Sequence, residues 1–445
     1  MTKNMQTKRT GGLAANLTNK LAMGLMVATA LSACGTRNAY QTSGRNGLTA
    51  PPGMVYVPSG TITYASLADS TEKGKTYSVS AFFIDKTEVT NEEYMKFINW
   101  VADSVAVTDY LKDEQYFLKE KGLRTVATGA GSTATSSAVV PTRKINWSKL
   151  NTSSPLWKSK KGDIQSKLAP MFVMNAGQLV LNPETVKYRF SYRKAGGGNN
   201  NQYVTDTVSV TPEMDIWSKD FPNAQMALYD RNYMTHKAFK NNPVVGVNWK
   251  QARAYADWKG KEMSAAAEKN PYLRGFNLAY SLPTEAQWQL AASGTNNGAD
   301  TSAQKLTTLD KKTKKQLLAI NYKQDDGSYS NDGSTFTVPV TSYAPNGFGL
   351  YNMLGNVSEW TMDAYSPSTT FFVNDLNPVL LYDANTTDGE ALRRKVVRGG
   401  SWKDPGSALN VDARGYETQN LGHSYIGFRC AMSAIEMASP QLKAK

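Results

Sequence analysis

The chain has 445 residues, of which 40% are apolar and 20% charged, and its net charge is +13. This much apolar material can build one large or two ordinary hydrophobic cores, which excludes intrinsic disorder, a collagen-like fibre and a disulfide-stapled miniprotein. The sequence contains two histidines and two cysteines. A metal centre built on three imidazoles therefore cannot form within one chain.

The first 33 residues have the features of a bacterial secretory signal. They carry four basic and no acidic side chains, then the apolar run Leu21–Leu31 and a Leu-Ser-Ala-Cys sequence that ends at Cys34. This pattern is typical of a lipoprotein signal, so we predict cleavage before Cys34 and lipidation of its thiol. The alternative is an ordinary signal peptide with a coincidental cysteine. Gly35 follows the cysteine, which favours an outer-membrane anchor that faces the periplasm.

Loss of the signal would remove its four positive charges and lower the net charge from +13 to +9. A secreted protein without a basic stripe of interleaved aromatic residues is not expected to bind nucleic acid. Residues 34–50 are rich in Gly, Ser, Thr and Asn and are predicted to form a tether. We predict one domain over residues 51–435 and a C-terminal tail over residues 436–445.

The first elements of the domain are predicted to be strands that lead into a helix. Residues 54–60 and 82–89 have the apolar and turn residues of short strands. Thr90 and Glu93 are spaced as a helix cap, and Tyr94, Phe97 and Val101 follow at helical spacing.

Residues 103–242 are polar and lysine-rich, with low-complexity patches at 128–137 and 196–201. Compact domains seldom carry such long loops, so we predict a long, partly ordered insertion with strands near residues 171–174 and 188–192. Two roles remain open for its large side chains, an interface with a partner or a satellite core beneath the insertion. These side chains are Tyr203, Trp217, Met226, Tyr229 and Tyr233.

The regular pattern resumes at residues 243–249, where a helix is predicted to bury Ala252, Tyr255, Ala256 and Trp258. Pro283 and Thr284 are predicted to begin a second helix that buries Trp288, Ala291 and Ala292. Glycines beside aromatic residues recur in segments 346–360, 398–402 and 427–430. These segments are too short for helices and indicate tight turns, so the sequence predicts an irregular α+β fold.

Taken together, these segments resemble the formylglycine-generating-enzyme (sulfatase-modifying-factor) domain, which is itself similar to the C-type lectin fold. The matches run in family order through residues 85–94, 243–249, 282–288, 347–360, 398–402 and 427–429. The resemblance implies that family's α+β fold with a long insertion over about residues 103–242.

The resemblance also implies which residues would carry catalysis. The oxidase of this family binds copper through two cysteines placed shortly after an Arg-Gly-Gly-Ser motif. Counted from Arg398, those positions hold Asp404 and Leu409, and no cysteine lies between Cys34 and Cys430. Related iron-dependent sulfoxide synthases use three histidines. We therefore expect no catalytic residues, no copper and no iron, and we expect Cys430 to be a core residue.

Four carboxylates beside aromatic residues admit two interpretations. Asp85, Glu88, Glu285 and Glu359 suggest either a paired-carboxylate hydrolase or anchors that hold loops through ion pairs. The resemblance favours anchors, with Arg398, Arg414 and Arg429 as partners. The predicted structural residues are Asp85, Glu88, Glu285, Trp288, Arg398 and Arg429.

The resemblance further implies structural calcium, which prefers carboxylate, amide and backbone oxygens. The positions that match the first family site are Asn352, Gly355, Val357 and Glu359. A second site matches less closely at Asn321, Tyr322, Asp332 and Ser334. The alternative is that Asn352 and Glu359 cap turns without a metal.

A narrower resemblance concerns the whole arrangement: a lipoprotein signal, a domain without the family's two catalytic cysteines, and a long insertion. It is similar to the gliding-motility and type IX secretion lipoproteins of Bacteroidetes, particularly the PorK/GldK group, with the GldJ group as a paralogous alternative. This resemblance implies a non-catalytic subunit of a homo-oligomeric ring under the outer membrane, bound to a periplasmic PorN/GldN-type protein. The alternative functions are a formylglycine-generating oxidase that acts on sulfatase cysteines and a surface glycan-binding module.

Overall fold

The computed structural model describes residues 41–42, 49–64, 74–118, 143–150, 154–175, 177–195, 203–269, 278–294, 307–309, 312, 314, 316–324 and 335–434. The predicted signal, Cys34, both low-complexity patches, Asp332, Ser334 and the predicted tail lie outside these residues. The chain divides into two compact units, one of residues 1–52 with 437–445 and one of residues 53–436. In the first unit, β1 (Gln41–Thr42) pairs with β2 (Thr49–Ala50).

The second unit contains an antiparallel three-stranded sheet in which β6 is central. The strands are β3 (Met54–Val57), β6 (Phe82–Asp85) and β17 (Ala431–Ser433). All four residues of β6 are buried, as expected of a strand with neighbours on both edges. Ile84 pairs with both Val55 and Ala431, so the two ends of this unit meet in one sheet. The predicted strand over 82–89 is shorter than expected, because it ends at Asp85.

A four-stranded sheet forms from segments after residue 357. Its order is β15 (Arg414–Thr418), β14 (Arg394–Arg398), β13 (Ser358–Ala364) and β16 (Ile426–Gly427). The pairs β13–β14 and β14–β15 are antiparallel, and β13–β16 is parallel. Gly399 follows β14 with φ at +94°, and a Cβ there would lie 2.8 Å from the Met353 carbonyl oxygen. The predicted tight turn is confirmed at this glycine.

Three helices begin at capping boxes. They are α2 (Asn91–Val105), α6 (Trp249–Ala267) and α7 (Glu285–Ser293). Thr90, Asn248 and Thr284 each accept from the backbone of the third helical residue, whose side chain bonds back to the cap. The predicted helix starts at residues 90 and 284 are confirmed, as is the burial predicted for the inner faces of α6 and α7, including Tyr255 and Trp288.

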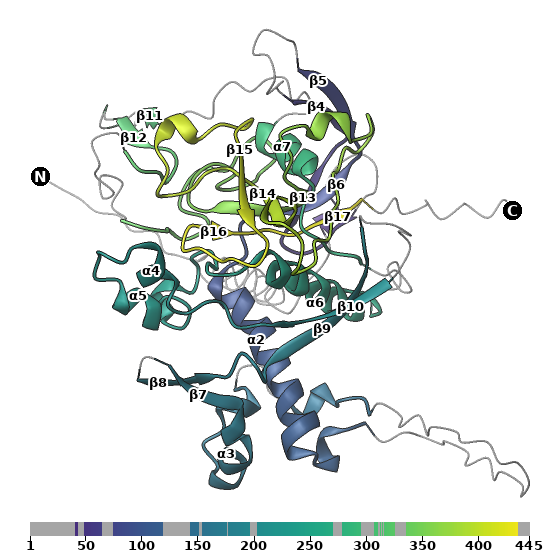
Figure 1. Ribbon diagram of the computed structural model, residues 1–445, viewed down its shortest axis with the longest axis vertical. Helices are drawn as coiled ribbons and strands as arrows, with labels where there is room; N and C mark the ends of the chain where they lie inside the picture. The colour runs from purple at the N-terminus through teal and green to yellow at the C-terminus, as the bar shows by residue number, and fades with distance from the viewer. Residues whose placement is uncertain are drawn as a thin grey trace, which may run out of the picture. The chain divides into compact units, whose positions relative to one another are not determined.

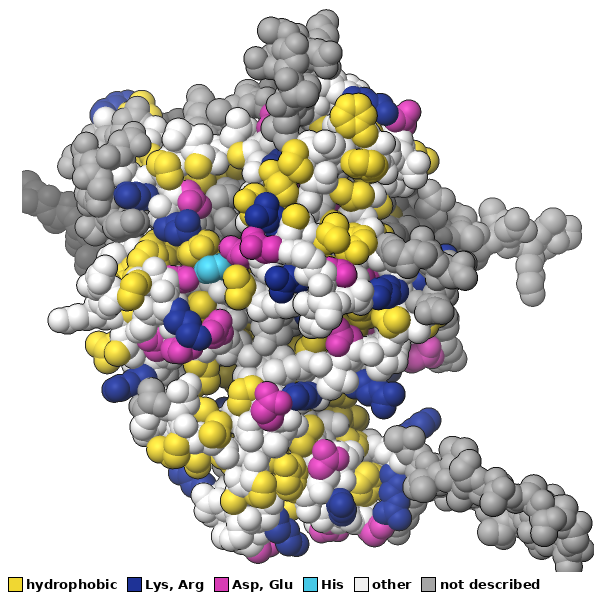
Figure 2. Space-filling model, viewed as in Figure 1, with side chains coloured by type: hydrophobic (Ala, Val, Ile, Leu, Met, Phe, Trp, Pro, Cys, Tyr) yellow, Lys and Arg dark blue, Asp and Glu magenta, His cyan; other side chains and the backbone are white. Residues whose placement is uncertain are grey.

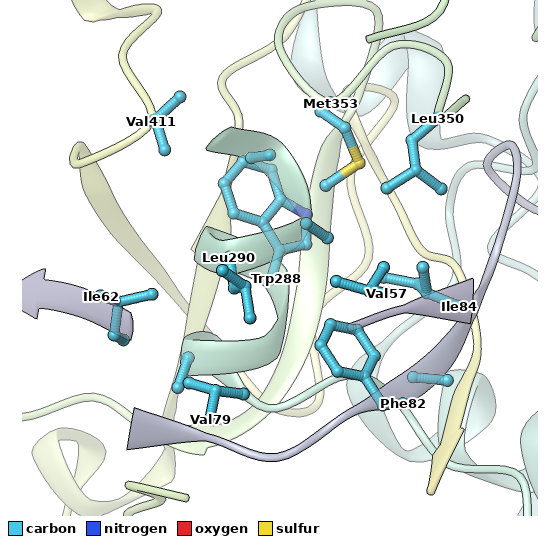
Figure 3. Packing of buried hydrophobic residues seen from close by; sticks show 14 of the residues in the cluster. Val57, Ile62, Val79, Phe82, Ile84, Trp288, Leu290, Leu350, Met353 and Val411 are labelled. Atoms are coloured by element: carbon cyan, nitrogen blue, oxygen red, sulfur yellow. The ribbon is translucent and has the colours of Figure 1, made fainter. Parts of the chain in front are cut away.

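One part of the core lies between α7 and the N-terminal strands. Figure 3 shows Trp288 from α7, with Met353 and the strand residues Val57, Phe82 and Ile84 all on the same side of this helix. The hairpin β4 (Gly60–Tyr64) and β5 (Lys75–Val79) adds Ile62 and other apolar side chains to the same cluster.

The segment predicted as an insertion contains regular structure throughout its described part. Helix α2 continues through Val105 into the π-helical turn η2 (Ala106–Leu111). Two hairpins follow, β7 (Phe172–Asn175) with β8 (Gln178–Leu181) and β9 (Lys187–Arg193) with β10 (Tyr203–Ser209). Both predicted strands of this segment are therefore present. The helices are α3 (Gly162–Leu168), α4 (Ile216–Asp220) and α5 (Ala227–Asn232), and Figure 1 shows α4 beside α5.

The large side chains of this segment form a satellite core. Trp217, Met226 and Tyr233 are buried together with Trp402 and Val245 of the surrounding domain. Tyr229 is half-buried against this cluster, whereas Tyr203 is 78% exposed. Packing rather than partner binding thus accounts for four of the five residues.

The remaining elements are short, and within the described residues no helix is long and apolar enough to cross a membrane. They are η3 (Glu114–Tyr116), η4 (Trp147–Lys149), η5 (Leu156–Lys158), η6 (Ala169–Met171), η7 (Lys237–Phe239), β11 (Thr307–Leu309), β12 (Gln316–Leu318), η8 (Thr369–Phe371), α8 (Glu390–Arg393) and η9 (Gly406–Ala408).

The satellite core predicts that Trp217→Ala destabilises the domain by about 3–5 kcal/mol, because it leaves a cavity where a buried indole packs. Urea unfolding measures the change. Tyr203→Ala removes an exposed aromatic side chain from the same segment and is expected to change stability by less than about 0.5 kcal/mol. Equal effects of the two substitutions would contradict the satellite core.

Candidate functional site

The positions that match the family's cysteines lie in the loop after β14, and they occupy different surroundings. Asp404 lines a cavity of about 360 Å³ bounded by this loop and by β14 and β15. Its Oδ2 accepts hydrogen bonds from the backbone nitrogen and the hydroxyl of Ser401, at 2.9 and 2.7 Å. Leu409 is 7% exposed and packs into the core around Trp288. The two side chains thus stabilise the loop.

The rim of this cavity is charged. The Lys403 ammonium lies 4.0 Å from the ring centroid of Tyr425 and 3.4 Å from Asp404 Oδ1. The His423 ring also stacks on Tyr425, at a centroid distance of 4.7 Å and an interplanar angle of 19°. Figure 2 shows a face where acidic and basic side chains alternate and a histidine lies beside acidic side chains.

His423 lies between two carboxylates. Its Nδ1 is 2.7 Å from Asp220 Oδ1, and its Nε2 is 3.1 Å from Glu417 Oε2. Burial opposes the charge of the imidazolium, but its interactions with the two carboxylates outweigh burial and raise the pKa of His423 to about 9. Burial likewise opposes the charge of both carboxylates, yet the interaction with His423 lowers the pKa of Asp220 and of Glu417.

The sequence interpretation did not find this cluster, because Asp220 and His423 are 203 residues apart. Asp220 also accepts hydrogen bonds from the backbone nitrogen and the hydroxyl of Ser424, at 2.6 and 2.7 Å. The cluster therefore joins the C-terminal end of α4 to the loop that precedes β16.

This cluster predicts a loss of stability at alkaline pH. Folding raises the pKa of His423 from 6.5 to about 9, so its contribution is complete below pH 6.5 and disappears as the pH rises through 9. Between these values the free energy of unfolding should fall by on the order of 2–3 kcal/mol more in the wild type than in His423→Gln. Urea unfolding at a series of pH values measures this, with the exposed His236→Gln as the control. Parallel pH profiles for the wild type and His423→Gln would contradict it.

Glu285 belongs to a buried network of charges. Its carboxylate accepts from Arg414 Nε at 2.6 Å and Nη2 at 2.8 Å, and Arg398 Nη1 lies 3.3 Å away. Asp363 accepts from the backbone nitrogen of Glu285 at 2.7 Å. Burial, together with the charge of Glu285, raises the pKa of Asp363 to about 7. This network connects the start of α7 to β13, β14 and β15.

A second buried network is centred on Arg429, which donates to both carboxylate oxygens of Glu359 at 2.7 Å. Trp288 Nε1 donates to the same carboxylate at 2.9 Å. The Asp85 carboxylate is paired with Lys259 at 2.8 Å rather than with an arginine, while the Asp85 carbonyl accepts from Arg429. Burial opposes the charge of Arg429, but Glu359 outweighs it and raises the pKa of this arginine.

Glu88 completes the set of predicted structural carboxylates. It accepts from Asn356 Nδ2 at 2.8 Å and from Asn352 Nδ2 at 3.2 Å. Burial raises its pKa to about 7, against the effect of Arg429. Asp85, Glu88, Glu285 and Glu359 are each at most 5% exposed, and their observed partners are side chains and backbone groups of this chain.

The Arg429 network predicts that Glu359→Gln lowers the free energy of unfolding by about 3–5 kcal/mol, because it leaves a buried guanidinium without its counter-charge. Thermal and urea unfolding measure the change. Glu184→Gln, which removes an exposed ion pair with Lys187, is the matched control and should cost less than about 1 kcal/mol. A neutral effect of Glu359→Gln would show that the buried pair does not stabilise the fold.

The residues of the first predicted calcium site lie near this network. Asn352 Nδ2 donates to Glu88 and to the Val340 carbonyl at 3.0 Å, and both oxygens of Glu359 accept from Arg429. A cation held by Glu359 would share this carboxylate with the guanidinium. Gly355 has φ at +77°, and Val357 is buried.

For the second predicted site, Asn321 Nδ2 donates to the Phe336 carbonyl at 2.8 Å, and Tyr322 is half-buried against the main core. Asp332 and Ser334 are outside the described residues. Within the described ranges, no three His, Cys, Asp or Glu side chains gather as a metal site requires. Calcium binding, which rests on amide and carbonyl oxygens as well, stays a prediction.

Cys430 is fully buried directly before β17, and burial raises the pKa of its thiol well above the usual value. A buried thiol with a raised pKa is a poor nucleophile. The burial of Cys430 agrees with the prediction that it is a core residue.

Residues 39–434 match the family described as the sulfatase-modifying factor enzyme 1-like domain, FGE-sulfatase. The chain therefore belongs to this family, and the resemblance seen in its sequence is confirmed. The matched range includes residues 103–242, and the long insertion predicted there is not confirmed. The narrower resemblance to the type IX secretion lipoproteins stays a prediction.

Curated relatives include active and inactive members of the family. The formylglycine-generating enzyme of Streptomyces coelicolor is 36% identical over 200 residues, which is 44% of this chain and 54% of that protein. The inactive C-alpha-formylglycine-generating enzyme 2 of Mus musculus is 30% identical over 198 residues, 43% of this chain and 49% of that protein. The chain thus spans about half the length of these relatives.

Among solved structures, PvdO from Pseudomonas aeruginosa aligns with a TM-score of 0.43 and 16% identity, covering 88% of this chain and 100% of that one. CarF aligns with a TM-score of 0.35 and 17% identity, covering 85% and 97% of the two chains.

Proposed function

We propose that this protein is a non-catalytic scaffold, a lipid-anchored ring subunit of the type IX secretion and gliding machinery. In this proposal Cys34 carries the lipid, the domain faces the periplasm, and a PorN/GldN-type protein is its partner. One observation supports the absence of catalysis in this proposal. Asp404 and Leu409 occupy the positions where the family's oxidase has cysteines.

The contacts of these two residues support a loss of catalysis. Cuprous ion requires soft thiolate ligands, which Asp and Leu cannot replace. Asp404 is bonded to Ser401, and Leu409 is in the core, so both positions now serve the loop's own stability. The name of the inactive mouse relative indicates that this family contains members without the activity.

Exposed apolar side chains support a role in assembly. Phe371 is 81% exposed and Phe372 66%, and both lie at the end of η8. On the β7–β8 hairpin, Met174 and Leu179 are 64% and 65% exposed. Large apolar side chains on a folded surface are typical of interaction sites. Two separate surfaces of this kind suit the head-to-tail contacts that close a ring.

The anchor and the assembly are tested together in membranes of the native host. We expect the wild-type protein to sediment with outer membranes and, after detergent extraction, to elute as a large assembly that contains a second periplasmic protein. Cys34→Ser should release most of the protein into the soluble fraction. A stable monomer without a partner in every detergent would contradict the proposal.

The oxidase alternative is tested by copper titration of the purified chain with a cysteine-containing sulfatase peptide. We expect neither stoichiometric cuprous binding nor conversion of the peptide, because the two ligand positions lack thiols. The Streptomyces coelicolor relative serves as the positive control. Multiple turnovers by this chain would contradict the proposal of a non-catalytic scaffold, whatever the oligomeric state of the protein.

A further inference from the structure

A second cavity, of about 560 Å³, lies between α2, α6 and the turns η4 and η7. It shares no lining residue with the cavity beside Asp404. Helices α2 and α6 pack against each other, so two stable elements form one side of this cavity. Its size is within the range of small-molecule sites, and neither the proposed scaffold role nor the family's oxidase chemistry uses it.

Three tryptophans line this cavity. Trp100 and Trp147 stack on each other, with ring centroids 4.8 Å apart and an interplanar angle of 17°. Trp258 from α6 is the third. Both Trp100 and Trp147 are half-buried, so part of their ring surface remains exposed. A flat, partly exposed indole offers a polarisable face for an apolar ring surface and an N–H donor at its edge.

The polar residues of the lining carry balanced charge. Asp103 is buried and lies on α2, where its Oδ1 accepts from the backbone nitrogen of Trp157 at 3.0 Å. Lysines and carboxylates occur in equal number, which favours a ligand without net charge. These charged residues are Glu92, Lys96, Asp103, Lys158, Lys240 and Glu262.

Two buried polar atoms beside the cavity have no hydrogen-bond partner among the described residues. They are the indole Nε1 of Trp258 and Oδ1 of Asn91. Such atoms are rare in folded proteins, because an unmet buried donor or acceptor is costly. Both atoms are enclosed by the protein, so a ligand in the cavity would contact the more exposed polar side chains of its lining, such as Glu92 and Lys240.

We infer that this cavity binds a neutral oligosaccharide, with a sugar ring against the Trp100–Trp147 pair and its hydroxyls bonded to the polar lining. A sugar ring combines an apolar C–H face with several hydroxyls, which matches indoles beside alternating donors and acceptors. A purely apolar ligand would cover the polar lining without forming hydrogen bonds to it. Calcium is not needed, because the ligand contacts are made by side chains.

The test is titration of the purified full-length protein with chitotriose, maltotriose and galacturonic acid trimer, monitored by tryptophan fluorescence and calorimetry. We expect at least one neutral trisaccharide to bind and to alter the fluorescence, with the acidic trimer bound at least tenfold more weakly. Preference for chitotriose would indicate an amino-sugar polymer as the source, and preference for maltotriose a glucose polymer. Binding should persist in EDTA.

Matched variants locate the site. Trp147→Ala should weaken binding at least tenfold, and Trp147→Phe, which keeps an aromatic face, should weaken it less. Tyr203→Ala removes an exposed aromatic residue outside the cavity lining and should leave binding unchanged. Thermal unfolding of each variant shows that the fold is retained. Absence of binding to both neutral trisaccharides at millimolar concentration, or equal affinity of the wild type and Trp147→Ala, would overturn the inference and leave the scaffold proposal untouched.

Discussion

The buried Arg429–Glu359 pair is the interaction on which the arrangement of the domain depends. Arg429 donates to Glu359 and to the carbonyl oxygens of Asp85 and Tyr351. Through one side chain, segments from the start, middle and end of the domain are held in register. A buried guanidinium is tolerated only where all its partners are in place, so this contact favours one arrangement of the surrounding loops over looser alternatives.

Much of this protein consists of loops rather than long strands. Buried polar residues hold these loops in place, which explains why there are so many of them. The Glu285 network holds the start of α7 against the four-stranded sheet, and the Arg429 network holds the other side of Trp288. Between them, the turn at Gly399 brings the loop of Asp404 and Leu409 close to the core. In this loop Asp404 is bonded to Ser401, and Leu409 packs into the core around Trp288.

Residues 203–242 are integrated into this frame, not appended to it. Trp217 and Tyr233 pack with Trp402, which belongs to the Arg-Gly-Gly-Ser-Trp segment, and Asp220 pairs with His423. The part nearer to α2 is different, because its Trp147 lines a cavity together with Trp100 of α2 and Trp258 of α6. One segment therefore supplies a packed core at one end and an open, aromatic cavity at the other.

The sequence alone determined the features that depend on neighbours along the chain. The capping boxes at Thr90 and Thr284, the buried helix faces and the turn at Gly399 follow from local chemistry, and the ordered motifs were enough to identify the family. The family resemblance also favoured arginine partners for Glu285 and Glu359, and the structure shows these pairs. Only the tertiary structure decided the partner of Asp85, which is Lys259, and the position of His423 between Asp220 and Glu417. These partners are far apart in the chain, so their pairing arises from how the helices and loops pack, which no local pattern encodes.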